Sequence, residues 1–274
     1  MDIGTINRWG RILEDSMRLR SLPIAVKFYE KSADIPAEAV RPMERYGKHM
    51  AFCQSLAYTR MKGMTMALCT QDHWCWTPLV CFGNVDCAPG DPAFEMISSR
   101  IGVPESDAAR KFFARLPRFP RGKYEAVVSA PLSKCSFEPD VVLVYADAAR
   151  TNHMVRTIKA VIGGRLDSSF DYIDSCIYST IPPFVNNEYR ITFPDPGDRE
   201  RARARDDEVI VSIPGARLGE FMETFEKQND SMAFGDQMFD FRLDFPRPKF
   251  YNDLFDIWGL ETGEEWERNS SASK

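Results

Sequence analysis

The stretch "EPDVVLVYADAARTNHMVRTIKAV", residues 138–161, combines a strand pattern with a helix pattern. Its β-branched run, which includes Val142 and Val144, predicts a buried strand. After a turn, Met154, Val155 and Ile158 recur on one face of a predicted helix. The stretch "RDDEVIVSIPGARLGEFMETFEKQ", residues 205–228, shows the same order of a strand, a turn and an amphipathic helix.

The two stretches align with each other when the first is shifted by 67 positions. The apolar helix faces also coincide, and each stretch follows a Tyr-led strand candidate, "KYEAVVSAP" or "EYRITFPDP". The chain therefore predicts a duplicated strand–strand–helix unit, against the alternative of a chance likeness between two similar units. The identical pairs are Val142 and Val209, Val144 and Val211, Ala149 and Ala216, Arg150 and Arg217, and Thr157 and Thr224.

The rest of the chain alternates between helical and extended patterns, which predicts an α/β protein with a mixed sheet and flanking helices. Residues 5–20, 48–63 and 104–116 have helical periodicity, and residues 23–30 form a β-branched, aromatic run. We expect a main α/β domain over residues 1–229. We expect residues 230–274 to form an aromatic C-terminal arm, extended and broken by prolines, that ends in a disordered tail. The arm needs an apolar partner, and wrapping a second copy of the chain would make a homodimer.

The composition limits the partners and the cellular compartment that we expect for this protein. The chain has 274 residues, 44% of them hydrophobic, and a formal net charge of −5. This balance favours neither a nucleic-acid nor a membrane partner. No secretory leader and no apolar run of about 18 residues is visible, so we expect a cytoplasmic protein. In that reducing compartment the seven cysteines are expected to be thiols or metal ligands rather than disulfides.

The duplication makes two arginines candidates for ligand binding. Arg150 and Arg217 occupy equivalent positions at the first turn of a helix that follows a strand. A helix start presents free N–H groups, and an added guanidinium makes it a receptor for anions. If the two starts lay near each other, they would hold a small anionic ligand such as a carboxylate or a diphosphate. The alternative is helix capping with a solvated arginine.

Five of the seven cysteines lie within residues 52–87, and four of these recur every six residues. Cys69 and Cys75 are two members of this series. Six residues turn a helix by about 240°, so the four cannot share one helical face. No CxxC pair and only three histidines are present, which disfavours a standard zinc or histidine-rich site. The alternative is that small, buried thiols simply fill the core.

The chain resembles the domain-of-unknown-function family numbered 169, the uncharacterised ArCR group. The resemblance rests on "LPIAVKFYE", "FCQSLAYTRMKG", "TQDHWCW", "EPDVVLVYADAART", "SFDYIDSCIYSTIPPF" and "PGDRERARARDDEVIVSIPGARL", which follow one another over about residues 8–226. The family is typical of anaerobes. The resemblance implies that Cys53, Cys75 and Cys176 are ligands. The fourth ligand would be Cys69, Cys135 or a group other than cysteine.

Three functions remain open at this stage. The first is a cysteine-ligated metal or iron–sulfur protein, with a [4Fe–4S] cluster as the suggested cofactor and a redox or accessory role in anaerobic metabolism. The second is a metal-free binding protein for an anionic small molecule or an acyl-CoA-like ligand. The third is a thiol enzyme in which Cys75 pairs with His73. The alternating arginines of "RERARARDDE", residues 199–208, are expected on one face of an extended, solvated hairpin.

Overall fold

The structure is a computed structural model, and it describes residues 1–98, 106–229 and 249–259. The chain divides into two compact units, Met1–Met232 and Ala233–Lys274. The helices of the first unit are α1 (Ile3–Met17), α2 (Pro42–Tyr46), α3 (Phe52–Lys62), α4 (Trp76–Cys81), α5 (Pro92–Ser98), α6 (Ser106–Arg115), α7 (Ala148–Ile162), α8 (Ser175–Tyr178), α9 (Ile181–Asn186), α10 (Pro196–Ala202) and α11 (Leu218–Asn229).

A six-stranded sheet forms the centre of the first unit, in the order β2-β3-β1-β4-β6-β5. Every ladder between these strands is antiparallel. The described residues add two isolated parallel bridges, Val40 with Met66 and Met50 with His73. The α/β class with flanking helices is confirmed. The strands are β1 (Ile24–Tyr29), β2 (Met66–Cys69), β3 (Ala126–Pro131), β4 (Val141–Ala146), β5 (Arg190–Thr192) and β6 (Val209–Pro214).

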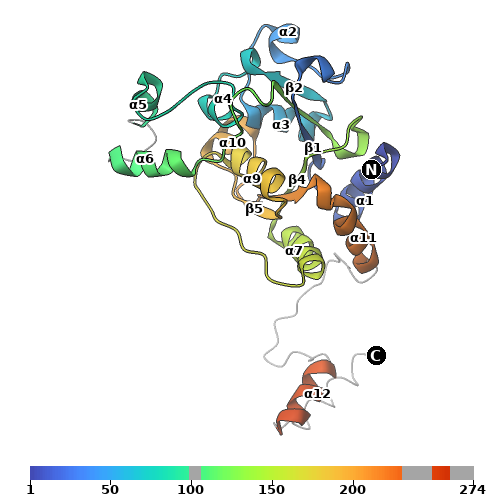
Figure 1. The fold of residues 1–274 in the computed structure, drawn as a ribbon. Helices are drawn as coiled ribbons and strands as arrows, with labels where there is room; N and C mark the ends of the chain where they lie inside the picture. Colours follow the sequence, from blue (N-terminus) through green and yellow to red (C-terminus); the bar gives the residue numbers. More distant parts are fainter. Residues whose placement is uncertain (99–105, 230–248, 260–274) are drawn as a thin grey trace. The chain divides into compact units, whose positions relative to one another are not determined.

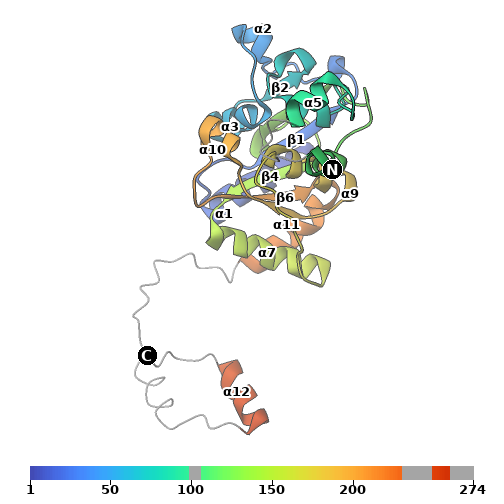
Figure 2. The same ribbon diagram turned by 90° about the vertical axis from the view of Figure 1, so that its left-hand side faces the viewer.

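Helices cover both faces of the sheet, which is why most strand residues are buried (Figure 1, Figure 2). Alternate residues of a strand point to opposite faces. In β4, Val142 and Val144 therefore pack with α1, α7 and α11, while Leu143 and Tyr145 pack on the other face with α3. Among the described residues, no helix is both long and apolar enough to cross a membrane.

The duplicated unit is visible in the pairing of β4 with β6. Val144 pairs with Val211, so the register is centred on two residues that the sequence alignment made equivalent. Helices α7 and α11, which follow these strands, pack against each other on one face. The leading strands are not equivalent, because β1 separates β3 from β4 while β5 pairs directly with β6. The strand–helix part of the repeat is thus preserved in space, and its first strand is not.

Helix α1 approaches the backbone that follows β3 so closely that one of its residues must lack a side chain. A Cβ atom built on Gly10 would lie 2.4 Å from the backbone nitrogen of Ser133. Gly219 in α11 is a matched comparison, because its Cβ would meet only side-chain atoms at 3.7 Å. The two positions therefore separate the effect of the clash from the effect of helix propensity.

We expect Gly10→Ala to lower the free energy of unfolding by about 1–3 kcal/mol, because the backbone must move to accept the methyl group. Gly219→Ala should raise it by roughly 0.5–1 kcal/mol, since alanine favours the helix. Urea denaturation of both variants measures the difference. Equal stabilities would show that α1 does not sit this close to residues 132–134.

Two further parts of the chain complete the described structure. Phe94 of α5 and Phe113 of α6 share a small apolar cluster with Val80 and Cys87. In the second unit, α12 (Lys249–Trp258) begins directly after the last proline of the arm, where the sequence predicted an extended, proline-broken segment. The remainder of the arm and the expected disordered tail lie outside the described residues. The homodimer stays a prediction.

A candidate site lined by three cysteines

Cys53, Cys75 and Cys176 line one cavity of about 480 Å³. They reach it from three separate parts of the chain: the first turn of α3, the residue before α4, and α8. No other cysteine among the described residues lines this cavity. The structure therefore brings together the three cysteines that the family resemblance selected.

Local hydrogen bonds fix the side of the cavity that carries Cys53 and Cys75. The Gln54 side chain accepts hydrogen bonds from the Ala51 backbone N–H at 2.9 Å and from the Trp74 indole at 3.1 Å. The start of α3 is thereby tied to the segment that leads into α4. The Cys53 thiol in turn lies 3.9 Å from the carbonyl oxygen of Gly197 in α10.

Asp195 fixes the opposite side. Its carboxylate caps α10 by accepting a hydrogen bond from the Asp198 backbone N–H at 2.7 Å. The same carboxylate accepts one from the Ser175 backbone N–H at 2.9 Å, at the start of α8. One side chain therefore holds two helix starts together and sets the position of Cys176.

Burial keeps the three thiols protonated at neutral pH. Burial is the largest cause that raises the pKa of the Cys53 thiol, and the negative charge of Asp198 is the second. Burial likewise raises the pKa of Cys75, and it raises that of Cys176 well above its usual value. For Cys176 the second cause is repulsion from a Cys53 thiolate. Thiolates in this cavity would therefore need a cation to stabilise them.

Asp174 is a functional candidate that the sequence interpretation missed. It lines the same cavity, is 9% exposed, and adopts a left-handed backbone conformation at φ 61°. Burial raises its pKa to about 7, although a hydrogen bond from Thr77 opposes the rise. Its Oδ2 atom has no hydrogen-bond partner within the described structure. The available signal was its position two residues before Cys176 in "DYIDSC".

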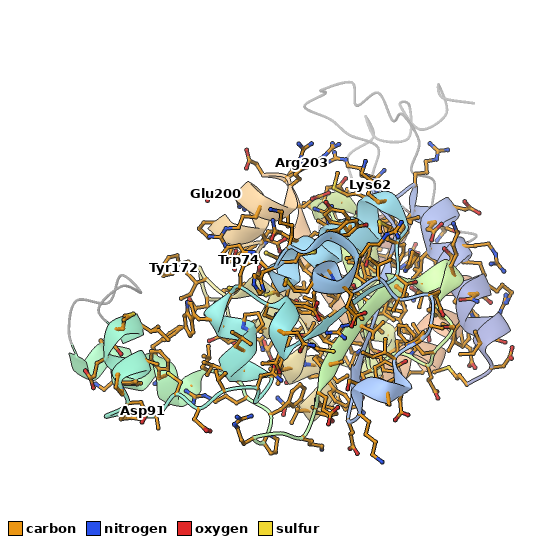
Figure 3. All side chains as sticks on the ribbon, turned by 90° about the horizontal axis from the view of Figure 1, so that it is seen from above. Lys62, Trp74, Asp91, Tyr172, Glu200 and Arg203 are labelled. Carbon is orange, nitrogen blue, oxygen red and sulfur yellow. The ribbon has the colours of Figure 1, made fainter. Side chains whose placement is uncertain are left out.

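The mouth of the cavity is aromatic and carries one cation. Trp74 and Tyr172, both exposed and labelled in Figure 3, line it together with Arg201. The Arg201 guanidinium lies 5.0 Å from the centre of the Trp74 ring. This arginine belongs to the alternating run that was expected to be extended. That prediction is wrong for Arg199 and Arg201, because residues 196–202 form helix α10, and Arg203 ends the helix in a left-handed conformation.

Cys69 does not join the other three cysteines. It ends β2 and lines a different, polar cavity of about 320 Å³ with Arg41. There the Asp72 carboxylate accepts hydrogen bonds from the Cys69 backbone N–H at 2.9 Å and from Arg41. Its suggested place as fourth ligand is therefore not supported by geometry. Cys135 packs on the other face of the sheet.

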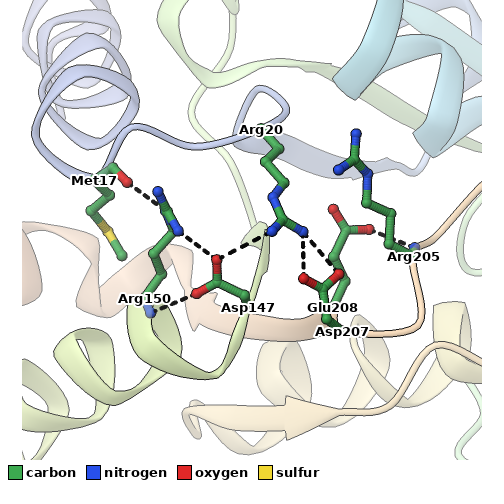
Figure 4. Close-up of polar contacts among 7 residues, drawn as sticks. All are labelled: Met17, Arg20, Asp147, Arg150, Arg205, Asp207 and Glu208. Atoms are coloured by element: carbon green, nitrogen blue, oxygen red, sulfur yellow. Dashed lines mark hydrogen bonds and ion pairs between the residues drawn. The ribbon is translucent and has the colours of Figure 1, made fainter. Parts of the chain in front are cut away.

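The two arginines of the duplicated unit are also apart. β4 and β6 run antiparallel, so the helix starts that follow them lie at opposite ends of a six-residue strand pair, roughly 20 Å in length. Figure 4 shows Arg150 paired with Asp147 and donating to the Met17 carbonyl oxygen at 2.7 Å. Arg217 pairs with Glu220 and stacks on Tyr189. The condition for a shared ligand, two neighbouring helix starts, is therefore not met.

His73 does not line the cavity, so the proposed pairing with Cys75 is not formed. The imidazole packs edge-on against Phe82, with ring centres 6.0 Å apart. Burial lowers its pKa to about 4, which keeps it neutral. A neutral imidazole outside the cavity leaves the Cys75 thiol without an activating base.

Two comparisons place the chain among known proteins. It is 24% identical over 228 residues to the uncharacterized protein MJ0308 of Methanocaldococcus jannaschii, an alignment that covers 82% of this chain and 96% of that protein. No solved structure matches the chain. The model of the DUF169 family, described as uncharacterised ArCR, matches residues 12–224. This chain therefore belongs to the DUF169 family.

Proposed function

We propose that the cavity of Cys53, Cys75 and Cys176 binds an iron–sulfur cluster, and that the protein has a redox or accessory role in anaerobic metabolism. The observation that carries the proposal is the convergence of three thiols from distant segments on one cavity. Thiolates are the usual ligands of such clusters. A bound cluster would supply electron transfer, or a Lewis-acidic iron where a cysteine ligand is missing.

The types of donor favour a cluster over a single ion, because three cysteines and, among the described residues, no histidine line the cavity. Among the residues that the structure describes, no three His, Cys, Asp or Glu side chains are placed to hold one metal ion. A cluster distributes its irons over the corners of a cube, so its thiolates stand further apart than the ligands of a single zinc ion. The cavity of about 480 Å³ also exceeds what one ion would fill.

The electrostatics of the thiols agree with a buried cationic group. Burial disfavours the thiolate forms of Cys53 and Cys176, and a Cys53 thiolate further disfavours that of Cys176. Iron would compensate these charges, and binding would release the thiol protons. We therefore expect cluster assembly to be slower at low pH.

A metal-free site for an anionic small molecule or an acyl-CoA-like ligand is the second candidate. One observation favours it: within the described part of the chain, Arg201 makes no hydrogen bond or ion pair, and it lines the mouth of the cavity. The N-terminus of α3 opens on the same cavity at Ala51 and Phe52. A guanidinium beside a helix start attracts an anion.

Reconstitution without oxygen tests the first candidate. Protein incubated with ferrous iron and sulfide should hold about four irons per chain and absorb broadly near ~400 nm. Cys53→Ser, Cys75→Ser and Cys176→Ser should each lose most of this iron. Cys69→Ser and Cys135→Ser are matched controls, because both remove a buried thiol outside the cavity.

Three outcomes are informative. Loss of iron confined to the three cavity variants supports the cluster. A folded, soluble wild-type protein that takes up no iron contradicts it. Binding of free coenzyme A or a simple carboxylate by that metal-free protein, abolished in Arg201→Ala, would instead support the second candidate.

A further inference from the structure

Asp174 carries a buried carboxylate oxygen without a hydrogen-bond partner among the described residues, in the wall of the cavity that the three cysteines line. The side chain lines their cavity and is 9% exposed. A hydrogen bond with Thr77 engages the carboxylate, and Oδ2 is left without a partner among the described residues. A buried carboxylate oxygen without a donor is costly, so its persistence points to a ligand.

The side chain of Asp174 does not cap the helix that follows it. The residue occupies the N-cap position of α8, where an aspartate normally accepts a hydrogen bond from the helix. Here the side chain makes no capping bond, and the left-handed conformation at φ 61° and ψ 34° turns it elsewhere. Such a conformation is uncommon outside glycine and is often found at functional positions.

Asp174 is connected to the two segments that carry Cys75 and Cys176. Asp174 lies two residues before Cys176 on α8. It also bonds Thr77, two residues after Cys75. Both thiols line the same cavity as Asp174. The carboxylate is therefore tied to the segments that carry two of the proposed ligands, in the cavity that those ligands line.

We propose that Asp174 is the fourth ligand of the cluster, bound through Oδ2 and completing the set of Cys53, Cys75 and Cys176. The inference rests on the proposed function. A carboxylate is a harder and weaker ligand for iron than a thiolate. The iron at Asp174 is then the exchangeable one. An external oxygen-donor anion of the size of a small carboxylate would replace Asp174 there, entering past Arg201.

The test compares Asp174→Asn, Asp174→Cys and wild type after reconstitution. Asp171→Asn is the matched control, because this nearby carboxylate does not line the cavity. Ferricyanide removes one electron from a [4Fe–4S]²⁺ cluster, and loss of one Fe²⁺ then leaves [3Fe–4S]⁺. We expect Asp174→Asn to convert in this way at least about tenfold faster than wild type, with about one of four irons lost. The measurements are iron content and electron paramagnetic resonance.

Asp174→Cys should resist the same oxidant and show a lower midpoint potential, since a fourth thiolate donates more charge to the cluster. Oxalate, used as the probe anion, should change the resonance spectrum of wild type and leave that of Asp174→Cys unchanged. Identical iron content, potential and spectra in wild type, Asp174→Asn and Asp174→Cys would overturn the inference while leaving the cluster intact. A wild type that binds no iron would instead refute the proposed function.

Discussion

Replacing Arg60 by methionine should lower the free energy of unfolding by about 3–5 kcal/mol, one of the largest effects expected for a single substitution in this chain. Arg60 is 3% exposed, and its ion pair with Glu208, at 3.7 Å, joins two side chains that are both buried. It also donates to the Ala202 carbonyl oxygen at 3.0 Å and lies over the Tyr145 ring at 4.2 Å. Methionine fills similar space but leaves the Glu208 charge uncompensated.

Two controls distinguish this mechanism from a simple loss of packing. The double variant Arg60→Met with Glu208→Gln should recover much of the loss, because it leaves no buried charge behind. Arg199→Met breaks an exposed pair with Asp206 and should cost at most about 1 kcal/mol. Urea denaturation at pH 7 measures all three. A cost for Arg60→Met no larger than that for Arg199→Met would contradict the buried ion pair.

The periodicity of apolar residues predicted helices and strands correctly where one face of the element is buried. The run around Val142 and the helix face at Met154 form β4 and α7, and their counterparts form β6 and α11. These residues are buried between a sheet and a helix layer, so the apolar pattern records their environment directly. The prediction of helix over residues 5–20 is confirmed by α1 for the same reason.

The direction of the strands could not be predicted from the same pattern. A buried strand has the same apolar run in a parallel and in an antiparallel ladder. Arg150 and Arg217 therefore occupy equivalent positions in the repeat, but the two residues do not lie close together. Helix α10 was missed for a different reason. Asp195 and Pro196 are a typical helix start, but the alternating arginines led to the prediction of an extended segment.

The candidate site could be predicted only in part. The positions of Cys53, Cys75 and Cys176 came from the family resemblance, since no spacing rule connects residues so far apart. Asp174 needed the three-dimensional structure, because its role depends on a left-handed backbone angle and an unused capping position. Neither property is visible in a sequence, where Asp is an ordinary residue before a helix.

Asp198→Asn is expected to remove a large pH dependence from the stability of the first unit. Asp198 is fully buried, and burial raises its pKa to about 7, with repulsion from Asp195 as the second cause. The Tyr145 hydroxyl donates to it at 3.0 Å and the Ser175 hydroxyl at 3.1 Å. In the unfolded chain the same carboxyl returns to a pKa near 3.8.

The sign follows from proton binding. Between pH 3.8 and about 7 the folded state keeps the Asp198 proton that the unfolded state has lost. The contribution of Asp198 to stability is therefore greatest at low pH and falls as the pH rises through this window. Above pH 7 the folded protein bears the full penalty of a buried charge, at most about 4 kcal/mol.

Asparagine cannot ionise, so Asp198→Asn removes this slope. Its buried amide costs stability by an amount that does not depend on pH, and that amount cancels when the difference from wild type is compared across pH. We expect the free energy of unfolding of the variant, relative to that of wild type, to rise by up to about 4 kcal/mol between pH 4 and pH 8. Urea denaturation of metal-free protein at four pH values within this range provides the measurement.

Asp207→Asn is the control with the opposite sign. Asp207 is exposed, and its hydrogen bond from Arg20 lowers its pKa. Its contribution is therefore present at neutral pH and lost as the pH falls, so the variant should become relatively less stable as the pH rises. If Asp198→Asn followed the same direction as Asp207→Asn, Asp198 would be ionised in the folded protein. The donors Tyr145 and Ser175 would then be stabilising its charge, and Cys53 would lie beside a permanent carboxylate.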